Sequence, residues 1–207
     1  MRVSDSAKVL FVHVPKTGGS TIDRFFDHEV DDAREVADLP RHSTYRRMLK
    51  AEPELASYWS FGFVRNPWAR LVSYWSMLNK VFGNAETGSE KARDKIARNP
   101  LWEREGAYRH DFDAFVLEAT VAIPKVGRPQ VRTLTGPSGL VEFIGRTEDF
   151  DEGVRVVRDR LGLSQLARVP RTNVSTHRPY QDYYNETTRR HVEEVFAPDI
   201  EAFGYSF

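Results

Sequence analysis

The residues best suited to bind an anion form one short run, Pro15-Lys16-Thr17-Gly18-Gly19-Ser20-Thr21. Two adjacent glycines carry no side chain, so backbone N–H groups there can approach an anion closely. The lysine before them can neutralise charge that develops on a departing oxygen. The Ser20-Thr21 pair is suited to cap a helix. These residue types predict a phosphate-binding loop. The alternative is an ordinary glycine turn with a solvated Lys16.

The position of the lysine separates this loop from that of the nucleoside triphosphatases. Their loop places four residues between its glycines and the lysine after the second glycine. Here Lys16 precedes Gly18 and Gly19, and the sequence contains no GxxxxGK run. The spacing therefore disfavours a kinase-like loop.

The elements that must position this loop are a strand before it and a helix after it. Val9 to Val14 is an apolar run rich in β-branched and aromatic residues, which predicts a buried strand of a mostly parallel sheet. Pro15 ends it. Apolar residues then recur at helical spacing, at Ile22, Phe25, Phe26 and Val30. Strand, turn and helix in this order aim the positive end of a helix dipole at the loop.

A second strand and helix carry another anion candidate, Arg65. Tyr58 to Val64 predicts a strand, and Asn66-Pro67 predicts an N-cap followed by proline at the first helical position. Arg65 stands at the strand end, where open α/β sheets place ligand-binding side chains, and a guanidinium can bind phosphate with two hydrogen bonds. The alternative for Arg65 is a structural ion pair. The apolar face of the helix is core rather than a base-stacking surface: Trp68, Leu71, Val72, Trp75, Leu78 and Phe82.

His42 is a candidate general base. It precedes Ser43 and Thr44, either of which could cap a short helix. A histidine titrates near neutral pH and can take a proton from a hydroxyl. The alternative is a surface or capping histidine.

We expect a single α/β domain over residues 1–207, with a mostly parallel, P-loop-like central sheet and helices on both faces. Leu140 to Gly145 predicts a third strand, and Asp149 with Glu152 predicts the cap of the next helix. Pro124 to Gly139 is rich in proline, glycine and arginine, which predicts irregular structure.

Composition limits the partners. Thirty basic and thirty acidic residues give no net charge, so there is no global electrostatic case for nucleic acid or an anionic membrane. The absence of cysteine excludes disulfides and thiolate metal sites. No apolar run is long enough to span a bilayer and the first residues lack a signal-peptide core, so we expect no integral membrane segment and a cytoplasmic chain.

Two segments together resemble the sulfotransferases that use 3′-phosphoadenosine 5′-phosphosulfate (PAPS). Val12 to Ser20 resembles their 5′-phosphosulfate loop, and Phe63 to Tyr74 resembles their 3′-phosphate segment, with Arg65 and Ser73 at the family's spacing of eight. Four further segments resemble the carbohydrate sulfotransferase branch: Arg41 to Thr44, Arg128 to Gln130, Phe143 to Phe150 and Phe203 to Phe207. The resemblance covers nearly the whole chain. The membrane anchor and the disulfides of lumenal relatives are both absent from this sequence, so it looks like a compact bacterial-type version.

The resemblance implies roles for individual residues. Lys16 would stabilise the bridging oxygen as the sulfuryl group leaves, and Arg65 with Ser73 would hold the 3′-phosphate. His42 would be the base, with Glu148 as a second candidate whose alternative is helix capping. The Arg-Lys-Gly element that closes on the 3′-phosphate in cytosolic relatives is missing, and Arg171 in Arg171-Thr172-Asn173 is the candidate substitute. The 5′-phosphosulfate would be held by Thr17, Gly18, Gly19, Ser20 and Thr21. No metal is needed.

The resulting hypothesis is transfer of a sulfuryl group from PAPS to a hydroxyl of an acceptor, a sugar or glycan. Two alternatives stay open. One is a P-loop-like small-molecule kinase, and the other is a nucleotide-binding or carbohydrate-binding protein without turnover. Binding of adenosine 3′,5′-bisphosphate without transfer would favour the second. The sequence leaves the identity of the acceptor and the oligomeric state open.

Overall fold

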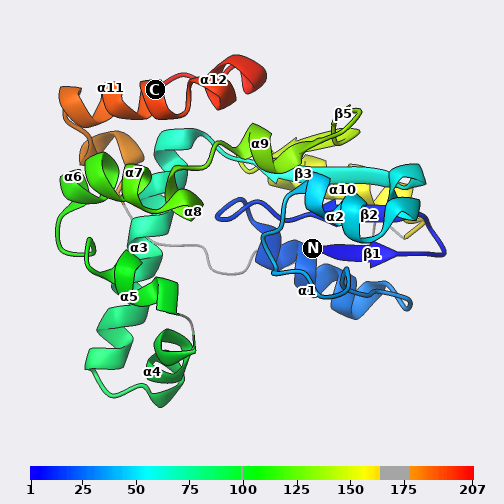
Figure 1. The fold of residues 1–207 in the computed structure, drawn as a ribbon, viewed down its shortest axis with the longest axis horizontal. Coiled ribbons are helices and arrows are strands. Elements are labelled where there is room, and N and C mark those ends of the chain that lie inside the picture. The colour runs from blue at the N-terminus through cyan, green and yellow to red at the C-terminus, as the bar shows by residue number, and fades with distance from the viewer. Residues whose placement is uncertain (99, 164–177) are drawn as a thin grey trace. The chain divides into compact units, whose positions relative to one another are not determined.

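The computed structural model describes residues 1–98, 100–163 and 178–207. The described chain divides into two compact units. The first contains residues 1–65 and 130–163, and the second contains residues 66–98, 100–129 and 178–207. The elements of each unit can be followed by their labels in Figure 1. The single domain expected over residues 1–207 stays a prediction.

The first unit is built on a sheet with the strand order β1-β2-β3-β6. β2 (Val9–Val12), β3 (Trp59–Val64) and β6 (Phe143–Arg146) are parallel, and β1 (Arg2–Ser4) pairs antiparallel with β2. In the register, Val12 lies opposite Gly62, which lies opposite Ile144. The predicted α/β class with a mostly parallel sheet is confirmed. The strand at β1 was not predicted.

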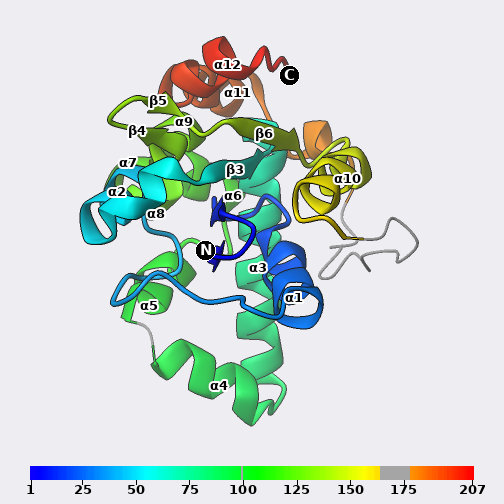
Figure 2. The ribbon, with the colours of Figure 1, turned by 90° about the vertical axis from the view of Figure 1, so that its right-hand side faces the viewer.

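Helices cover both faces of this sheet. α1 (Gly19–Glu29) and α10 (Phe150–Arg160) pack on one face, where Phe26 and Phe150 join a buried cluster with Phe11, Phe61 and Phe63 of the strands. Figure 2 shows these two helices beside the strands. Because successive side chains of a strand point to opposite faces, Gly62 faces the other side. A Cβ at Gly62 would lie 2.4 Å from the side chain of Leu134, so α9 (Gln130–Leu134) covers that side.

The segment from residue 124 to 139 is more regular than its composition suggested. It contains α8 (Pro124–Gly127), α9 and β4 (Thr135–Gly136), and it ends at β5 (Gly139–Leu140), which pairs with β4. Proline occupies the first turn of α8, a position that requires no N–H donor, so it starts a helix there instead of preventing one. The prediction of irregular structure was wrong. The predicted third strand is likewise divided between β5 and β6.

Two shorter elements complete the first unit. α2 (Tyr45–Ala51) is capped by Thr44, whose hydroxyl accepts a hydrogen bond from the Arg47 N–H at 3.3 Å. The 3₁₀ turn η1 (Pro53–Ser57) follows it and leads into β3. The Thr44 cap was one of the two alternatives that the sequence offered.

The second unit is helical and is organised around α3 (Pro67–Glu86). The Asn66 side chain accepts from the N–H groups of Trp68 at 3.1 Å and Ala69 at 3.3 Å, and Pro67 stands at the first helical position, so the predicted helix start is confirmed. The apolar face of α3 packs into a buried cluster with residues of later helices, including Phe115, Val192 and Phe196.

The remaining elements of the second unit follow α3 along the chain. They are α4 (Glu90–Ala97), α5 (Pro100–Gly106), α6 (Phe112–Ala114), the π-helical turn η2 (Phe115–Ala119), α7 (Thr120–Ala122), α8, the 3₁₀ turn η3 (Tyr180–Tyr183), α11 (Glu186–Val195) and α12 (Ala197–Phe203). None of the helices in the described ranges has the length and apolar character needed to cross a bilayer.

Candidate functional site

The loop between β2 and α1 has an unusual backbone. Lys16 has a φ of 70° and Gly18 a φ of 81°, so two left-handed residues flank Thr17. A left-handed conformation costs a non-glycine residue roughly 1–2 kcal/mol, and such strain persists where the surrounding structure imposes it. Backbone turned in this way directs successive N–H groups toward one side, where they can bind an anion. The loop therefore has the conformation of an anion-binding turn.

The side chain of Thr17 holds this turn together. Its hydroxyl donates a hydrogen bond to the carbonyl oxygen of Val14 at 3.0 Å, and the residue is fully buried. The hydroxyl thus closes the loop on itself. What Thr17 offers to a ligand is its backbone.

Gly18, not Ser20 or Thr21, is the N-cap of α1, and no side chain of the described residues caps the helix. The predicted Ser-Thr cap was wrong because the helix begins at Gly19, which places both hydroxyl residues inside its first turn. The Thr21 N–H donates to the Gly18 carbonyl at 2.8 Å, and the N–H groups that precede it in a first turn have no carbonyl of their own helix to bind. The positive end of the α1 dipole is therefore presented at the glycine loop.

Both glycines are required by what packs against them. A Cβ at Gly19 would lie 2.1 Å from Nε2 of His13, and one at Gly18 would lie 2.6 Å from the ring of Phe150. Gly18 is also left-handed. The sequence predicted that the glycines leave space for an anion. The structure adds that neighbouring side chains lie close behind both of them.

Behind the loop lies a buried pair, His13 and Asp23. Nδ1 of His13 is 3.2 Å from Oδ2 of Asp23, although the alignment falls short of hydrogen-bond geometry. Burial lowers the pKa of His13 to about 4, against the opposing effect of Asp23. Burial alone would raise the pKa of Asp23, but contacts with His13 and Arg41 give a net lowering. At neutral pH the pair is therefore a neutral imidazole beside an ionised carboxylate.

The loop before α2 brings Arg41 and His42 to the glycine loop. Arg41 donates from Nε to Oδ2 of Asp23 at 2.9 Å, pairs with the same oxygen through Nη2, and donates from Nη2 to the Ser20 hydroxyl at 3.0 Å. Nδ1 of His42 lies 3.2 Å from the carbonyl oxygen of His13, and the two rings meet edge to face with centroids 4.6 Å apart. His42 is half-buried.

The contact with the His13 carbonyl assigns the tautomer of His42. A carbonyl oxygen can only accept, so Nδ1 must carry the hydrogen of this contact. In the neutral ring, Nε2 then holds the lone pair. Nε2 is therefore the basic atom of His42.

Arg65 leaves the same edge of the sheet as the glycine loop. β2 and β3 are parallel neighbours, so the residues after Val12 and Val64 emerge at one edge. The fully buried Gln130 side chain fixes the Arg65 backbone, because Oε1 accepts from the Arg65 N–H at 3.0 Å and Nε2 donates to the Arg65 carbonyl at 2.7 Å. The parallel pairing of these two strands, on which the predicted juxtaposition of their following loops depends, is confirmed.

The other predicted site residues lie on other segments of the chain. Ser73 lies on α3 in the second unit and is 6% exposed. Glu148 is exposed and lies between β6 and α10, where Asp149 occupies the N-cap without a side-chain cap hydrogen bond. Arg171 lies outside the described residues. Among the described residues, no cluster of three or more histidine, cysteine or acidic side chains could hold a metal ion.

The sequence predicted no role for four residues that support the two loops: His13, Asp23, Arg41 and Gln130. Asp23 had a signal, since it is a charged residue directly beside the apolar stripe of a helix, next to Ile22 and three residues before Phe26. His13 gave no such signal, because it lies within an apolar run. The contact between Gln130 and Arg65 could not be inferred from the sequence, because the two residues lie far apart in the chain.

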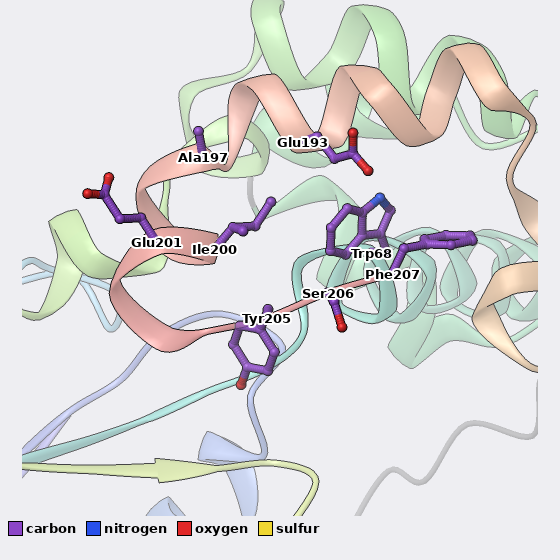
Figure 3. Close-up of a pocket in the computed structure, with 8 residues that line it drawn as sticks. All are labelled: Trp68, Glu193, Ala197, Ile200, Glu201, Tyr205, Ser206 and Phe207. Carbon is purple, nitrogen blue, oxygen red and sulfur yellow. The ribbon is translucent and has the colours of Figure 1, made fainter.

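The second unit contains a separate pocket of about 440 Å³. Figure 3 shows its lining, which comes from the start of α3, from α11 and α12, and from the residues after α12: Trp68, Glu193, Ala197, Ile200, Glu201, Tyr205, Ser206 and Phe207. None of the predicted site residues lines it.

Comparison with known proteins gives one match. The family model described as "Sulfotransferase family" matches residues 1–206. Searches of curated proteins and of solved structures returned no match. The family match covers nearly all of the sequence, including the glycine loop and the loops that carry His42 and Arg65. The chain therefore belongs to the sulfotransferase family.

Proposed function

We propose that this protein transfers a sulfuryl group from PAPS to a hydroxyl of an acceptor, a sugar or glycan. The observation that carries the proposal is the glycine loop, a strained turn at an uncapped helix start with Lys16 at its mouth. Membership of the sulfotransferase family supports sulfuryl transfer in general. That PAPS is the donor and that the acceptor is a sugar or glycan is our proposal.

The loop fits the anionic end of PAPS. A phosphosulfate needs closely spaced N–H donors and a positive charge, and the loop offers backbone N–H groups, the α1 dipole and Lys16. Glycine at positions 18 and 19 lets the loop backbone pack directly against Phe150 and His13, where a Cβ would clash. We assign residues 17–21 and Lys16 to the 5′-phosphosulfate.

The reaction is an in-line displacement. The acceptor oxygen forms a bond to sulfur while the bond from sulfur to the 5′-phosphate oxygen breaks, and the acceptor proton passes to a base. The products are the sulfated acceptor and adenosine 3′,5′-bisphosphate. Lys16 neutralises the charge that develops on the departing oxygen, so positioning and electrostatics supply most of the catalysis.

His42 is the proposed base. Its Nδ1–H is committed to the His13 carbonyl, so Nε2 is the atom that takes the proton. Glu148 is the second candidate and is exposed. The assignments of Arg65, Ser73 and Arg171 to the 3′-phosphate rest on the sequence resemblance alone.

The test is calorimetric titration with adenosine 3′,5′-bisphosphate, 5′-AMP and ATP. We expect the bisphosphate to bind at least tenfold more tightly than the other two, about 1.4 kcal/mol of discrimination. Equal or tighter binding of ATP would refute the donor assignment and favour the kinase alternative. Bisphosphate binding with no transfer from PAPS to any glycan acceptor would favour a non-catalytic binding protein.

Three variants separate the roles. Lys16→Ala should lower turnover far more than bisphosphate affinity, whereas Arg65→Ala should mainly weaken nucleotide binding. His42→Ala should lower turnover, because the acceptor hydroxyl then has no base at that position. A His42→Ala rate constant within a few fold of the parent at every pH would eliminate His42 as the base.

A further inference from the structure

Arg41 is a cation at the glycine loop that the proposed reaction has not used. We propose that Arg41 binds the 5′ anionic group of the donor, and that Asp23 is the residue that positions it. This inference rests on the proposed function, because it names a further ligand contact of the same site.

The first support is where the guanidinium lies. Nη2 of Arg41 donates to the hydroxyl of Ser20 at 3.0 Å, and Ser20 is the second residue of α1. A positive charge is thus fixed within one hydrogen bond of the uncapped helix start. An anion bound by the N–H groups of this turn lies next to that charge.

The second support is that Arg41 is held without being buried. Nε and Nη2 both contact Oδ2 of Asp23, and the side chain of Arg41 is 49% exposed while that of Asp23 is 11% exposed. Within the described part of the chain, the contacts of Arg41 use Nε and Nη2, which leaves the two N–H groups of Nη1 for a ligand. A guanidinium can bind two oxygens of a phosphate or sulfate in parallel, which a lysine cannot.

The third support is the fixed position of Asp23. Oδ2 of its carboxylate contacts both Arg41 and Nδ1 of the buried His13, the latter at 3.2 Å. Oδ1 lies 3.6 Å from the N-terminal amine and 3.8 Å from Nε of Arg2. A carboxylate that is held in this way restrains the arginine before any anion arrives. Less ordering entropy is then lost on binding than with a freely moving side chain.

The experiment compares two ligands that differ at the 5′ position only. Adenosine 3′,5′-bisphosphate carries a 5′-phosphate and 3′-AMP does not. We expect Arg41→Ala to weaken binding of the bisphosphate at least tenfold and to change binding of 3′-AMP less than threefold. Arg41→Lys, which keeps the charge without the planar fork, should lie between the parent and Arg41→Ala. Arg46→Ala, an exposed arginine on α2, is the matched control and should change neither ligand.

Asp23→Asn tests the positioning role. It should lower the preference for the bisphosphate over 3′-AMP in the parent protein but not in the Arg41→Ala background. A merely structural role for Asp23 would reduce the thermal midpoint in both backgrounds without changing that preference. Circular dichroism of every variant checks that it is folded.

The outcomes separate the two proposals. If the unmodified protein binds the bisphosphate no better than ATP, the proposed donor is wrong and this inference fails with it. If the parent binds the bisphosphate selectively but Arg41→Ala weakens both ligands equally or weakens neither, Arg41 is only a partner of Asp23. That second result overturns this inference and leaves the proposed function standing.

Discussion

Gly19→Ala is the substitution whose cost can be worked out most directly from the structure. The added Cβ would lie 2.1 Å from Nε2 and 2.2 Å from Cδ2 of His13. Ordinary contact begins at 3.4 Å, so the His13 ring or the start of α1 must move by about 1 Å. The ring cannot turn aside easily, because it is 3% exposed and packs against Asp23 and His42.

Overpacking of this kind costs about 1–3 kcal/mol. Gly83→Ala is the matched control, because Gly83 lies within α3 with nothing near its added Cβ, and the substitution should stabilise by about 0.5–1 kcal/mol. For a chain of this length, about 2 kcal/mol corresponds to roughly 4–8 °C in the unfolding midpoint. We expect Gly19→Ala to unfold that far below the parent, and Gly83→Ala at or above it.

A double-mutant cycle isolates the contact with His13. Thermal unfolding followed by circular dichroism gives the cost of Gly19→Ala in the parent and in a His13→Ala background. If the clash is the cause, the cost in that background should fall to within about 0.5 kcal/mol of zero, since the obstructing ring is gone. An equal cost in both backgrounds would refute the steric argument.

Three other residues of the first unit can be tested by substitution: His13, Gln130 and Lys16. Because burial lowers the pKa of His13 to about 4 from 6.5, the unfolded chain binds a proton that the folded protein excludes between these pH values. Acidification from pH 7 to 4 should therefore lower the free energy of unfolding of the parent by about 3 kcal/mol more than that of His13→Gln, as measured by urea unfolding. Equal losses would contradict a neutral, buried His13. Gln130→Leu should destabilise by about 2–4 kcal/mol, because it leaves the Arg65 N–H and carbonyl without the partners seen here. A loss below about 1 kcal/mol would show that this pairing contributes little to stability. Lys16→Gly should be about 1 kcal/mol more stable than Lys16→Ala, because glycine tolerates a φ of 70°. Both variants should lose turnover. Equal unfolding midpoints would mean that the turn relaxes without strain.

The features that the sequence predicted correctly are local ones. Asn66 and Pro67 define the start of α3 within two residues, because a cap and a preset φ act on adjacent peptide groups. The apolar runs at β2 and β3 are readable because a strand buried on both faces tolerates few polar residues. Continuous apolar runs of this kind are typical of parallel strands, so their parallel pairing could be inferred as well.

The wrong predictions concern segments whose composition had two meanings. Proline, glycine and arginine between residues 124 and 139 are compatible with a loop and equally with short helices that begin at proline. Ser20 and Thr21 are good capping residues, but Gly18 adopts the left-handed conformation and takes the N-cap instead. In both cases the residue types were compatible with more than one boundary, so composition alone did not decide where the helix begins.

The sequence by itself determined the glycine loop, its lysine and the strand and helix that flank it, since these depend on residues close together in the chain. Only the tertiary structure decided which residues support that loop and the loop that carries Arg65. His13, Asp23 and Arg41 meet across a turn and a connecting segment, and Gln130 reaches Arg65 across 65 positions of sequence. Periodicity and residue type report which positions are buried, but they do not report which buried polar groups become partners. The tertiary fold determines these partners, because it brings together residues that are far apart in the sequence.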